Sequence, residues 1–192
     1  MSDKLMRTFL SIPVPFEVGS KKNMFYSTIE DSKGNINWVK NANLHLTLKF
    51  LGNTPESSFQ MVIDSVEKIT KDIKPFNLKI EKTGCFPVET RPRVLWMGVK
   101  GRTDPLLELV KDIEYNLHDL GFHKESQVFF PHVTLARIKY PQKVTPNIEL
   151  FLKSTYDAID FPIDRVQYFG SELLKTGAVY NLLKTFPLGE KL

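Results

Sequence analysis

Predicted strands and helices follow the same order twice along this chain of 192 residues, and this repeat constrains the fold more than any other feature. The first half is expected to hold strands at 7–13, 44–51 and 76–81, with helices from 15 to about 30 and from 54 onward. The second half is expected to hold strands at 94–99, 128–138, 162–169 and 178–186, with helices at 104–121 and about 146–156. Both halves begin strand, helix, strand, helix, strand, which indicates an internal duplication.

The spacing within the two halves also matches. Arg7, in the first strand, lies 38 residues before His45, and Val94 lies 38 residues before His132. A duplication of this kind predicts one domain over 1–192, made of two lobes that cover roughly 1–90 and 91–192. Residues at equivalent places in the two lobes would then face each other across a central cleft.

The segment LHLTLKFL at 44–51 gives the clearest strand signal. Leucine or phenylalanine occupies every second position, and His45, Thr47 and Lys49 lie between them. Successive side chains of a strand point to opposite faces, so these three polar side chains are expected on one face. The next helix is expected to open with Thr54 as its N-cap and Pro55 as its first residue.

A His-x-Thr motif occurs in the second strand of each half, as His45-Leu46-Thr47 and His132-Val133-Thr134. Residues two apart on a strand share a face, so each motif presents an imidazole beside a hydroxyl. An imidazole can give or take a proton near neutral pH, and a threonine hydroxyl can donate a hydrogen bond to an oxyanion. We therefore predict a catalytic site that combines His45, Thr47, His132 and Thr134.

This set of groups suits in-line displacement at phosphorus. One imidazole would remove a proton from water, while the other would protonate the leaving oxygen on the far side of the phosphorus. A single His-x-Thr is more often a partly buried histidine with a satisfied hydrogen bond. Two copies in equivalent strands, among only four histidines in the chain, favour the catalytic interpretation.

Composition and missing motifs limit the ligands, the cofactors and the cellular location that we expect. The net charge of +4 and the isoelectric point of about 9.0 favour anions without establishing nucleic-acid binding. The sequence has no HExxH, zinc-spaced Cys/His cluster, P-loop or GxGxxG, so we expect neither a metal nor a cofactor. Cys85 is the only cysteine, and no segment has the length of a membrane span, so we expect a cytoplasmic protein without membrane contact.

With these motifs the sequence resembles the two-histidine phosphoesterases, and among them the bacterial and archaeal RNA 2',3'-cyclic phosphodiesterases, also called 2'-5' RNA ligases. The resemblance covers nearly the whole chain and is carried by RTFLSIPVP, NWVKNANLHLTLKFLGNTP, GCFPVETRPRVLWMGV, FFPHVTLARIK and GAVYNLLKTFPL. It implies an α/β (α+β) bilobal fold, in which two pseudo-symmetric antiparallel-sheet lobes with outer helices surround a central cleft.

The same resemblance implies an activity and roles for the motif residues. The activity is metal-independent hydrolysis of RNA 2',3'-cyclic phosphate ends to 2'-phosphomonoesters. His45 would protonate the departing 3'-oxygen, His132 would activate water, and Thr47 and Thr134 would hold the phosphate.

Two further residues, Arg137 and Lys49, are expected to bind substrate. By resemblance, Arg137 matches an arginine that acts at the phosphate, but in a regular strand it would face away from the second motif. It reaches the site only if the strand ends or bulges near Ala136, and otherwise it is a surface arginine. Lys49 would share a face with His45 and lend positive charge, or else be solvated at the end of the strand.

Several functional alternatives stay open at this level. The same groups would serve on 2'-5' linked oligonucleotides or on small cyclic nucleotides, and the reaction could run in reverse as 2'-5' RNA ligation. A non-catalytic module that binds RNA or nucleotides would need the basic cleft but not both histidines. Under the main hypothesis we expect a monomer that acts on RNA or nucleotides with 2',3'-cyclic phosphate ends.

Overall fold

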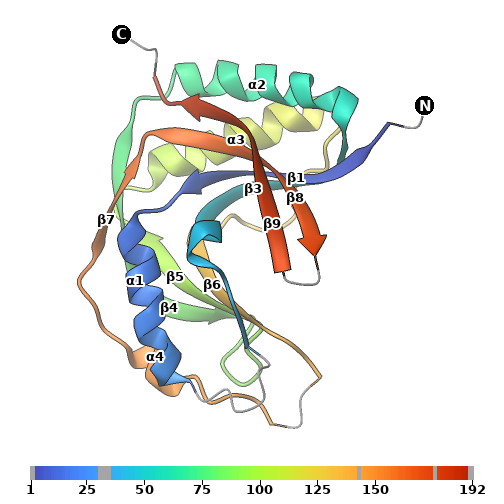
Figure 1. Ribbon diagram of the computed structural model, residues 1–192. Helices are drawn as coiled ribbons and strands as arrows, with labels where there is room; N and C mark the ends of the chain where they lie inside the picture. The colour runs from blue at the N-terminus through green and yellow to red at the C-terminus, as the bar shows by residue number, and fades with distance from the viewer. Residues whose placement is uncertain (1–2, 30–35, 142–143, 175–176, 190–192) are drawn as a thin grey trace.

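The structure is a computed structural model that describes residues 3–29, 36–141, 144–174 and 177–189. Its elements are β1 (Leu5–Pro13), α1 (Phe16–Met24), η1 (Phe25–Thr28), β2 (Ile36–Trp38), η2 (Asn41–Asn43), β3 (His45–Pro55), η3 (Glu56–Ser58), α2 (Phe59–Lys71), β4 (Phe76–Phe86), β5 (Val94–Lys100), α3 (Asp104–Asp119), β6 (His132–Ile138), α4 (Glu149–Lys153), β7 (Ile159–Ile163), β8 (Arg165–Leu174) and β9 (Gly177–Pro187). Figure 1 shows these strands as one curled sheet with the helices on its outside.

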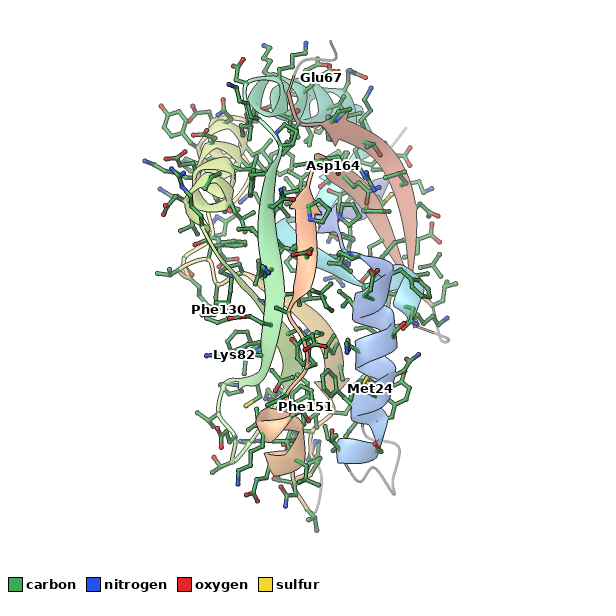
Figure 2. All side chains as sticks on the ribbon, turned by 90° about the vertical axis from the view of Figure 1, so that its left-hand side faces the viewer. Met24, Glu67, Lys82, Phe130, Phe151 and Asp164 are labelled. Atoms are coloured by element: carbon green, nitrogen blue, oxygen red, sulfur yellow. The ribbon has the colours of Figure 1, made fainter. Side chains whose placement is uncertain are left out.

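The sheet is antiparallel and has the order β7-β4-β5-β6-β3-β1-β8-β9, with β2 paired to β6. Helices α2 and α3 lie together at one end of the molecule, and α1 and α4 lie toward the other (Figure 1). Figure 2 shows Glu67 of α2 and Phe151 of α4 at these opposite ends. Phe151 is fully buried and makes an edge contact with Phe25 of η1, at 5.3 Å between ring centroids. This mixed architecture confirms the predicted fold class.

The sheet is almost divided between β3 and β6, which pair only at Leu46 and Val133. One half-sheet, made of β1, β3, β8 and β9, carries the first motif, and the other, made of β2 and β4 to β7, carries the second. Strands β2 and β4 belong to the first half of the sequence but lie in the second half-sheet. Strands β8 and β9 belong to the second half of the sequence but lie in the first half-sheet. The predicted lobes at 1–90 and 91–192 thus describe halves of the sequence, and each half-sheet combines strands from both.

The equal spacing of 38 residues does not mark equivalent positions in the two halves. Val94 pairs with Arg137, which lies five residues after His132. Phe9 pairs with Phe50, which lies five residues after His45. Phe9, rather than Arg7, therefore corresponds to Val94. The numerical match of Arg7 with Val94 is therefore no argument for a duplication.

The predicted helix start at Thr54 is wrong. Thr54 is buried within β3, and its Oγ1 lies 2.7 Å from Oγ1 of Thr8 on β1. This cross-strand hydrogen bond keeps Thr54 in the sheet, so the strand runs on to Pro55. The helix begins only at Phe59, after the η3 turn.

Three other predicted elements differ in extent. Strand β6 begins at His132 rather than 128, because Pro131 has no N–H to donate to the ladder. The segment 162–169 is two strands separated at Asp164, because β7 pairs with β4 in one half-sheet and β8 pairs with β1 in the other. The helix expected at 146–156 is the five-residue α4.

Candidate active site

The two His-x-Thr motifs meet at the junction of β3 and β6. Their middle residues, Leu46 and Val133, form the pair that joins these strands, and both are buried in the core. Continued by one residue, the antiparallel register places the histidine of each motif opposite the threonine of the other. These four side chains leave the sheet on the face opposite to Leu46 and Val133. The structure thus brings two imidazoles and two hydroxyls together in a two-fold arrangement.

Each motif histidine is held by the backbone carbonyl two residues before it. Nδ1 of His45 lies 2.8 Å from the carbonyl oxygen of Asn43, and Nδ1 of His132 lies 2.7 Å from that of Phe130. A carbonyl oxygen only accepts, so Nδ1 must carry the hydrogen in both rings. In the neutral ring Nε2 then has the lone pair, and this is the nitrogen that can take or give a proton.

A β-bulge in each motif strand changes which side chains face the cleft. The extra residue is Leu48 in β3 and Leu135 in β6, in each case the residue after the motif threonine. The β1–β3 register shifts a second time at Leu51, beyond Phe50. Beyond the bulge the alternation is reversed, so Phe50 and Arg137 lie on the face of the motifs. The bulge at Leu135 is the irregularity that Arg137 requires to reach the site, and Arg137 lines the cavity described below.

The same reversal removes Lys49 from the site, which corrects the prediction that it faces the cleft with His45. Lys49 is buried on the opposite face, where its Nζ lies 2.8 Å from both carboxylate oxygens of Glu114 on α3. It also donates a hydrogen bond of 2.7 Å to the carbonyl of His123. Lys49 therefore anchors α3 and the segment after it to β3 rather than binding substrate.

A cavity of about 370 Å³ opens over the first motif. Of the predicted site residues, His45, Thr47, Thr134 and Arg137 line it. His132 is not among the lining residues, but it lies within the electrostatic reach of Arg137. The cavity lies over β3 and its neighbours β1, β8 and β9, and β6 contributes Thr134 and Arg137 to its lining, so the cavity is not symmetric about the two motifs.

Aromatic rings surround both histidines. The ring centroid of His45 lies 4.9 Å from that of Phe9, in a stacked arrangement, and 5.5 Å from that of Tyr180. The ring centroid of His132 lies 5.1 Å from that of Phe86 and 6.2 Å from that of Phe130, which is labelled in Figure 2. These rings restrict the imidazole orientations and displace water from around them.

Burial lowers the pKa of both histidines below the ordinary value of 6.5. The hydrogen bonds to the carbonyls of Asn43 and Phe130 act in the opposite direction and raise these pKa values. The positive charge of Arg137 lowers both further. Both imidazoles are therefore expected to be neutral at pH 7 when no ligand is bound, and His45 is the more buried of the two.

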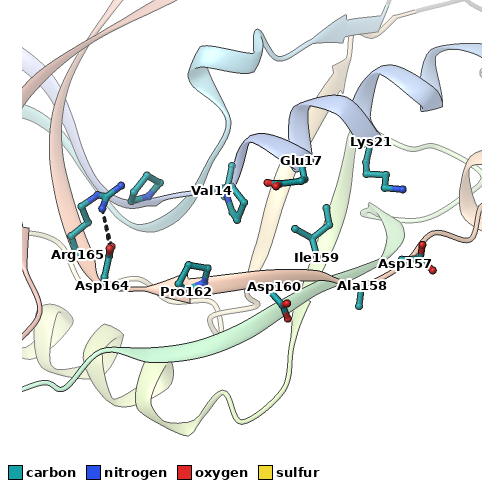
Figure 3. A pocket seen from close by; sticks show the side chains of 12 residues that line it. Val14, Glu17, Lys21, Asp157, Ala158, Ile159, Asp160, Pro162, Asp164 and Arg165 are labelled. Atoms are coloured by element: carbon teal, nitrogen blue, oxygen red, sulfur yellow. Dashed lines mark hydrogen bonds and ion pairs between the residues drawn. The ribbon is translucent and has the colours of Figure 1, made fainter.

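A second cavity, of about 580 Å³, lies between the start of α1 and β7. Figure 3 shows Glu17 and Lys21 of α1 across from Ile159 of β7, with Arg165 paired to Asp164 at one end. None of the predicted site residues lines this cavity.

Over the described ranges, no three His, Cys, Asp or Glu side chains are grouped so that they could hold a metal ion. A search of the same residues also finds no helix with the length and apolar character required to cross a membrane.

The sequence did not identify Asn43 as a residue of the site. Its carbonyl holds His45, and its Nδ2 donates a hydrogen bond of 2.9 Å to the carbonyl of Ala178 on β9. Asn43 thus ties the first motif to the strand that forms one wall of the cavity. An asparagine two residues before a motif histidine carries no local signal of this role, because its partner lies 135 residues away.

The curled antiparallel sheet presents two imidazoles, and Nδ1 of each is hydrogen-bonded to the carbonyl two residues before it. These features place the chain in the class of two-histidine phosphoesterases. The family model described as LigT like Phosphoesterase matches residues 12–96 and again residues 98–180. The chain belongs to this LigT-like phosphoesterase family.

Individual relatives extend this result. The chain is 36% identical to the RNA 2',3'-cyclic phosphodiesterase of Aquifex aeolicus over 79% of its own length and 81% of that protein. It is 31% identical to the RNA 2',3'-cyclic phosphodiesterase of Thermotoga maritima over 93% of each chain.

Solved structures show the same fold. The protein TT0787 of Thermus thermophilus superposes with a TM-score of 0.80 at 27% identity, over 97% of this chain and 100% of that one. Escherichia coli LigT in complex with 3'-AMP superposes with a TM-score of 0.77 at 21% identity, over 97% of this chain and 100% of that one.

Proposed function

We propose that this protein hydrolyses 2',3'-cyclic phosphate ends of RNA to 2'-phosphomonoesters, without a metal, through general acid–base catalysis by His45 and His132. The observation that carries the proposal is the paired arrangement of the motifs, in which both Nδ1 atoms are held by carbonyls and each Nε2 can exchange a proton. The relatives named RNA 2',3'-cyclic phosphodiesterase support this substrate class.

The reaction assigns one proton transfer to each histidine. Nε2 of His132 takes a proton from water, whose oxygen attacks phosphorus and forms a new P–O bond. The bond from phosphorus to the 3'-oxygen breaks on the opposite side, and Nε2–H of His45 protonates that oxygen. The products are a 2'-phosphate and a free 3'-hydroxyl. Each proton transfer contributes a factor of roughly 100 to 10,000 to the rate.

One observation supports this division of roles, and a second supports binding of the phosphate. His132 is less buried than His45, which favours His132 as the group that meets water. Arg137, together with the hydroxyls of Thr47 and Thr134, provides donors for the non-bridging oxygens and for the charge that develops on them. Bound phosphate would also raise the pKa of His45 and so favour the protonated form that the acid requires.

The proposal is tested by incubating the purified protein with adenosine 2',3'-cyclic phosphate in the presence of EDTA and identifying the product. We expect adenosine 2'-phosphate, with turnover unchanged by EDTA. His45→Ala and His132→Ala should each reduce kcat by about 100-fold or more, because each removes one proton-transfer group. A 3'-phosphate product, or a strict requirement for added metal, would contradict the mechanism.

The same variants separate catalysis from simple binding. If the chain were only a nucleotide-binding module, the wild-type protein would bind the nucleotide without any turnover for the variants to lose. We further propose that the protein acts as a monomer in the cytoplasm. Both motif histidines come from one chain, and the single cysteine excludes an internal disulfide.

A further inference from the structure

A second arginine reaches the cavity over the first motif. Arg7 of β1 lines this cavity together with Arg137 of β6, and Ser171 of β8 lies opposite Arg7 in the sheet. The ion pairs found among the described residues all involve other cations, so in this part of the chain no carboxylate neutralises either arginine. Two cations without counter-charges in one cavity indicate a ligand that carries two anionic groups.

The two arginines lie at different distances from the motifs. In the β1–β3 register, His45 lies opposite Pro13 at the end of β1. Arg7 lies six residues before Pro13, near the start of β1, and is opposite Asn53. Phe9 lies between these positions and stacks on His45, and its ring centroid is 4.9 Å from that of Tyr180. The cavity therefore continues from the motifs, past aromatic rings, toward a second guanidinium.

Tyr180 lies within the electrostatic reach of both Arg7 and Arg137. Burial raises the pKa of its hydroxyl, and the charges of Arg137 and Arg7 both lower it. Its ring therefore stands within reach of both guanidinium groups. Phe50, which is 60% exposed and lines the same cavity, adds a second aromatic side chain that a ribose or base could contact.

We propose that Arg7 binds the phosphate on the 5'-oxygen of the terminal nucleotide, so that the site prefers RNA ends over nucleosides that carry only the cyclic phosphate. This inference rests on the proposed function. A 2',3'-cyclic phosphate occupies both the 2'- and the 3'-oxygen, so the RNA chain can continue only through the 5'-phosphate. When the cyclic phosphate lies at the motifs with Arg137, the ribose lies along the aromatic rings and the next phosphate lies toward Arg7.

The test compares three substrates with the wild-type protein and with Arg7→Gln. The substrates are adenosine 2',3'-cyclic phosphate, its 5'-phosphorylated form, and the dinucleotide ApA with a 2',3'-cyclic end. The readout is the ratio of kcat/KM for each phosphate-bearing substrate to kcat/KM for the nucleoside. We expect this ratio to be about 10 to 100 in the wild type and to fall to near one in Arg7→Gln, because the variant loses a charge-assisted hydrogen bond of that size.

Two further variants make the result specific. Arg7→Lys keeps the charge and should restore part of the ratio. Arg165→Gln removes an equal charge from β8 outside this cavity, where Arg165 pairs with Asp164, and should leave the ratio unchanged. Added NaCl should reduce the ratio in the wild type more than in Arg7→Gln, because salt screens the contact.

The outcomes distinguish this inference from the proposed function. A wild-type ratio near one, or a ratio that Arg7→Gln leaves unchanged while the protein still turns over all three substrates, would overturn the inference alone. Absence of turnover on every substrate would overturn the proposed function and, with it, the role of Arg7.

Discussion

At the scale of residues, the protonation of the site depends on a balance of three local effects. Burial and the charge of Arg137 lower the pKa of both motif histidines, and the two carbonyl hydrogen bonds raise it. The proposed mechanism requires one neutral and one protonated imidazole at the same time. The pH dependence of kcat/KM is therefore expected to be bell-shaped, with its maximum midway between the two pKa values.

This balance predicts where the maximum lies and how it moves. Both pKa values are below 6.5 in the free protein, so the maximum of kcat/KM is expected on the acidic side of pH 6.5. Arg137→Gln removes a charge that lowers both pKa values, so the maximum should move to higher pH. The same change should reduce kcat/KM by about 10- to 100-fold if Arg137 binds the phosphate as proposed.

The measurement is kcat/KM for a nucleoside 2',3'-cyclic phosphate between pH 4.5 and about 9, where a bell-shaped profile can be fitted. Arg165→Gln is the matched control, because Arg165 lies outside the cavity. An unchanged or more acidic maximum in Arg137→Gln would show that Arg137 does not act on the histidines.

At the scale of elements, one bulge in each motif strand decides the role of two cations. The bulge in β6 turns Arg137 to the cleft, and the bulge in β3 turns Lys49 away from it. Lys49 then pairs with Glu114 of α3, with side chains only 2% and 14% exposed. This pair joins β3 to the helix that packs on the outer face of the sheet and belongs to the framework of the site.

The ion pair predicts a loss of stability rather than of chemistry. Lys49→Met leaves the carboxylate of Glu114 largely buried without a cation, so the free energy of unfolding should fall by about 3 kcal/mol. Adding Glu114→Leu removes the unpaired charge and should recover most of the loss.

Urea denaturation measures both effects. Lys79→Met provides the control, because the Lys79–Asp160 pair is 58% and 88% exposed and should contribute about 1 kcal/mol or less. If Lys49→Met were as stable as the wild type but had lost phosphate affinity, Lys49 would be a substrate ligand after all.

At the scale of the whole molecule, the two halves of the sequence exchange strands. Strand β4 from the first half pairs with β5 and β7, and β8 from the second half pairs with β1. Each half-sheet is therefore completed by a strand from the other half. The motifs lie where the two half-sheets meet, so the site requires both halves to be folded together.

This exchange predicts that neither half folds alone. Fragments 1–90 and 91–192 should each lack a cooperative thermal transition, because each would expose apolar strand faces that its missing partner strands cover. A mixture of the fragments should recover a single transition and the activity, as measured by circular dichroism and turnover. Cooperative unfolding of an isolated fragment would show that the predicted lobes are independent units.

The sequence alone determined the positions of both motifs, the sharing of a face by His45 and Thr47 and by His132 and Thr134, and most strands and helices. These features depend on a period of two residues and on neighbours in the chain, so local order suffices to predict them. Only the tertiary structure decided that Lys49 is buried, that Arg137 and Arg7 enter the cavity, and that strands cross between the halves. A bulge exists only through the pairing of a strand with its neighbour, and the strands that pair with β3 and β6 at their bulges lie tens of residues away along the chain. The side to which a cation points is therefore set by contacts that a local pattern does not contain.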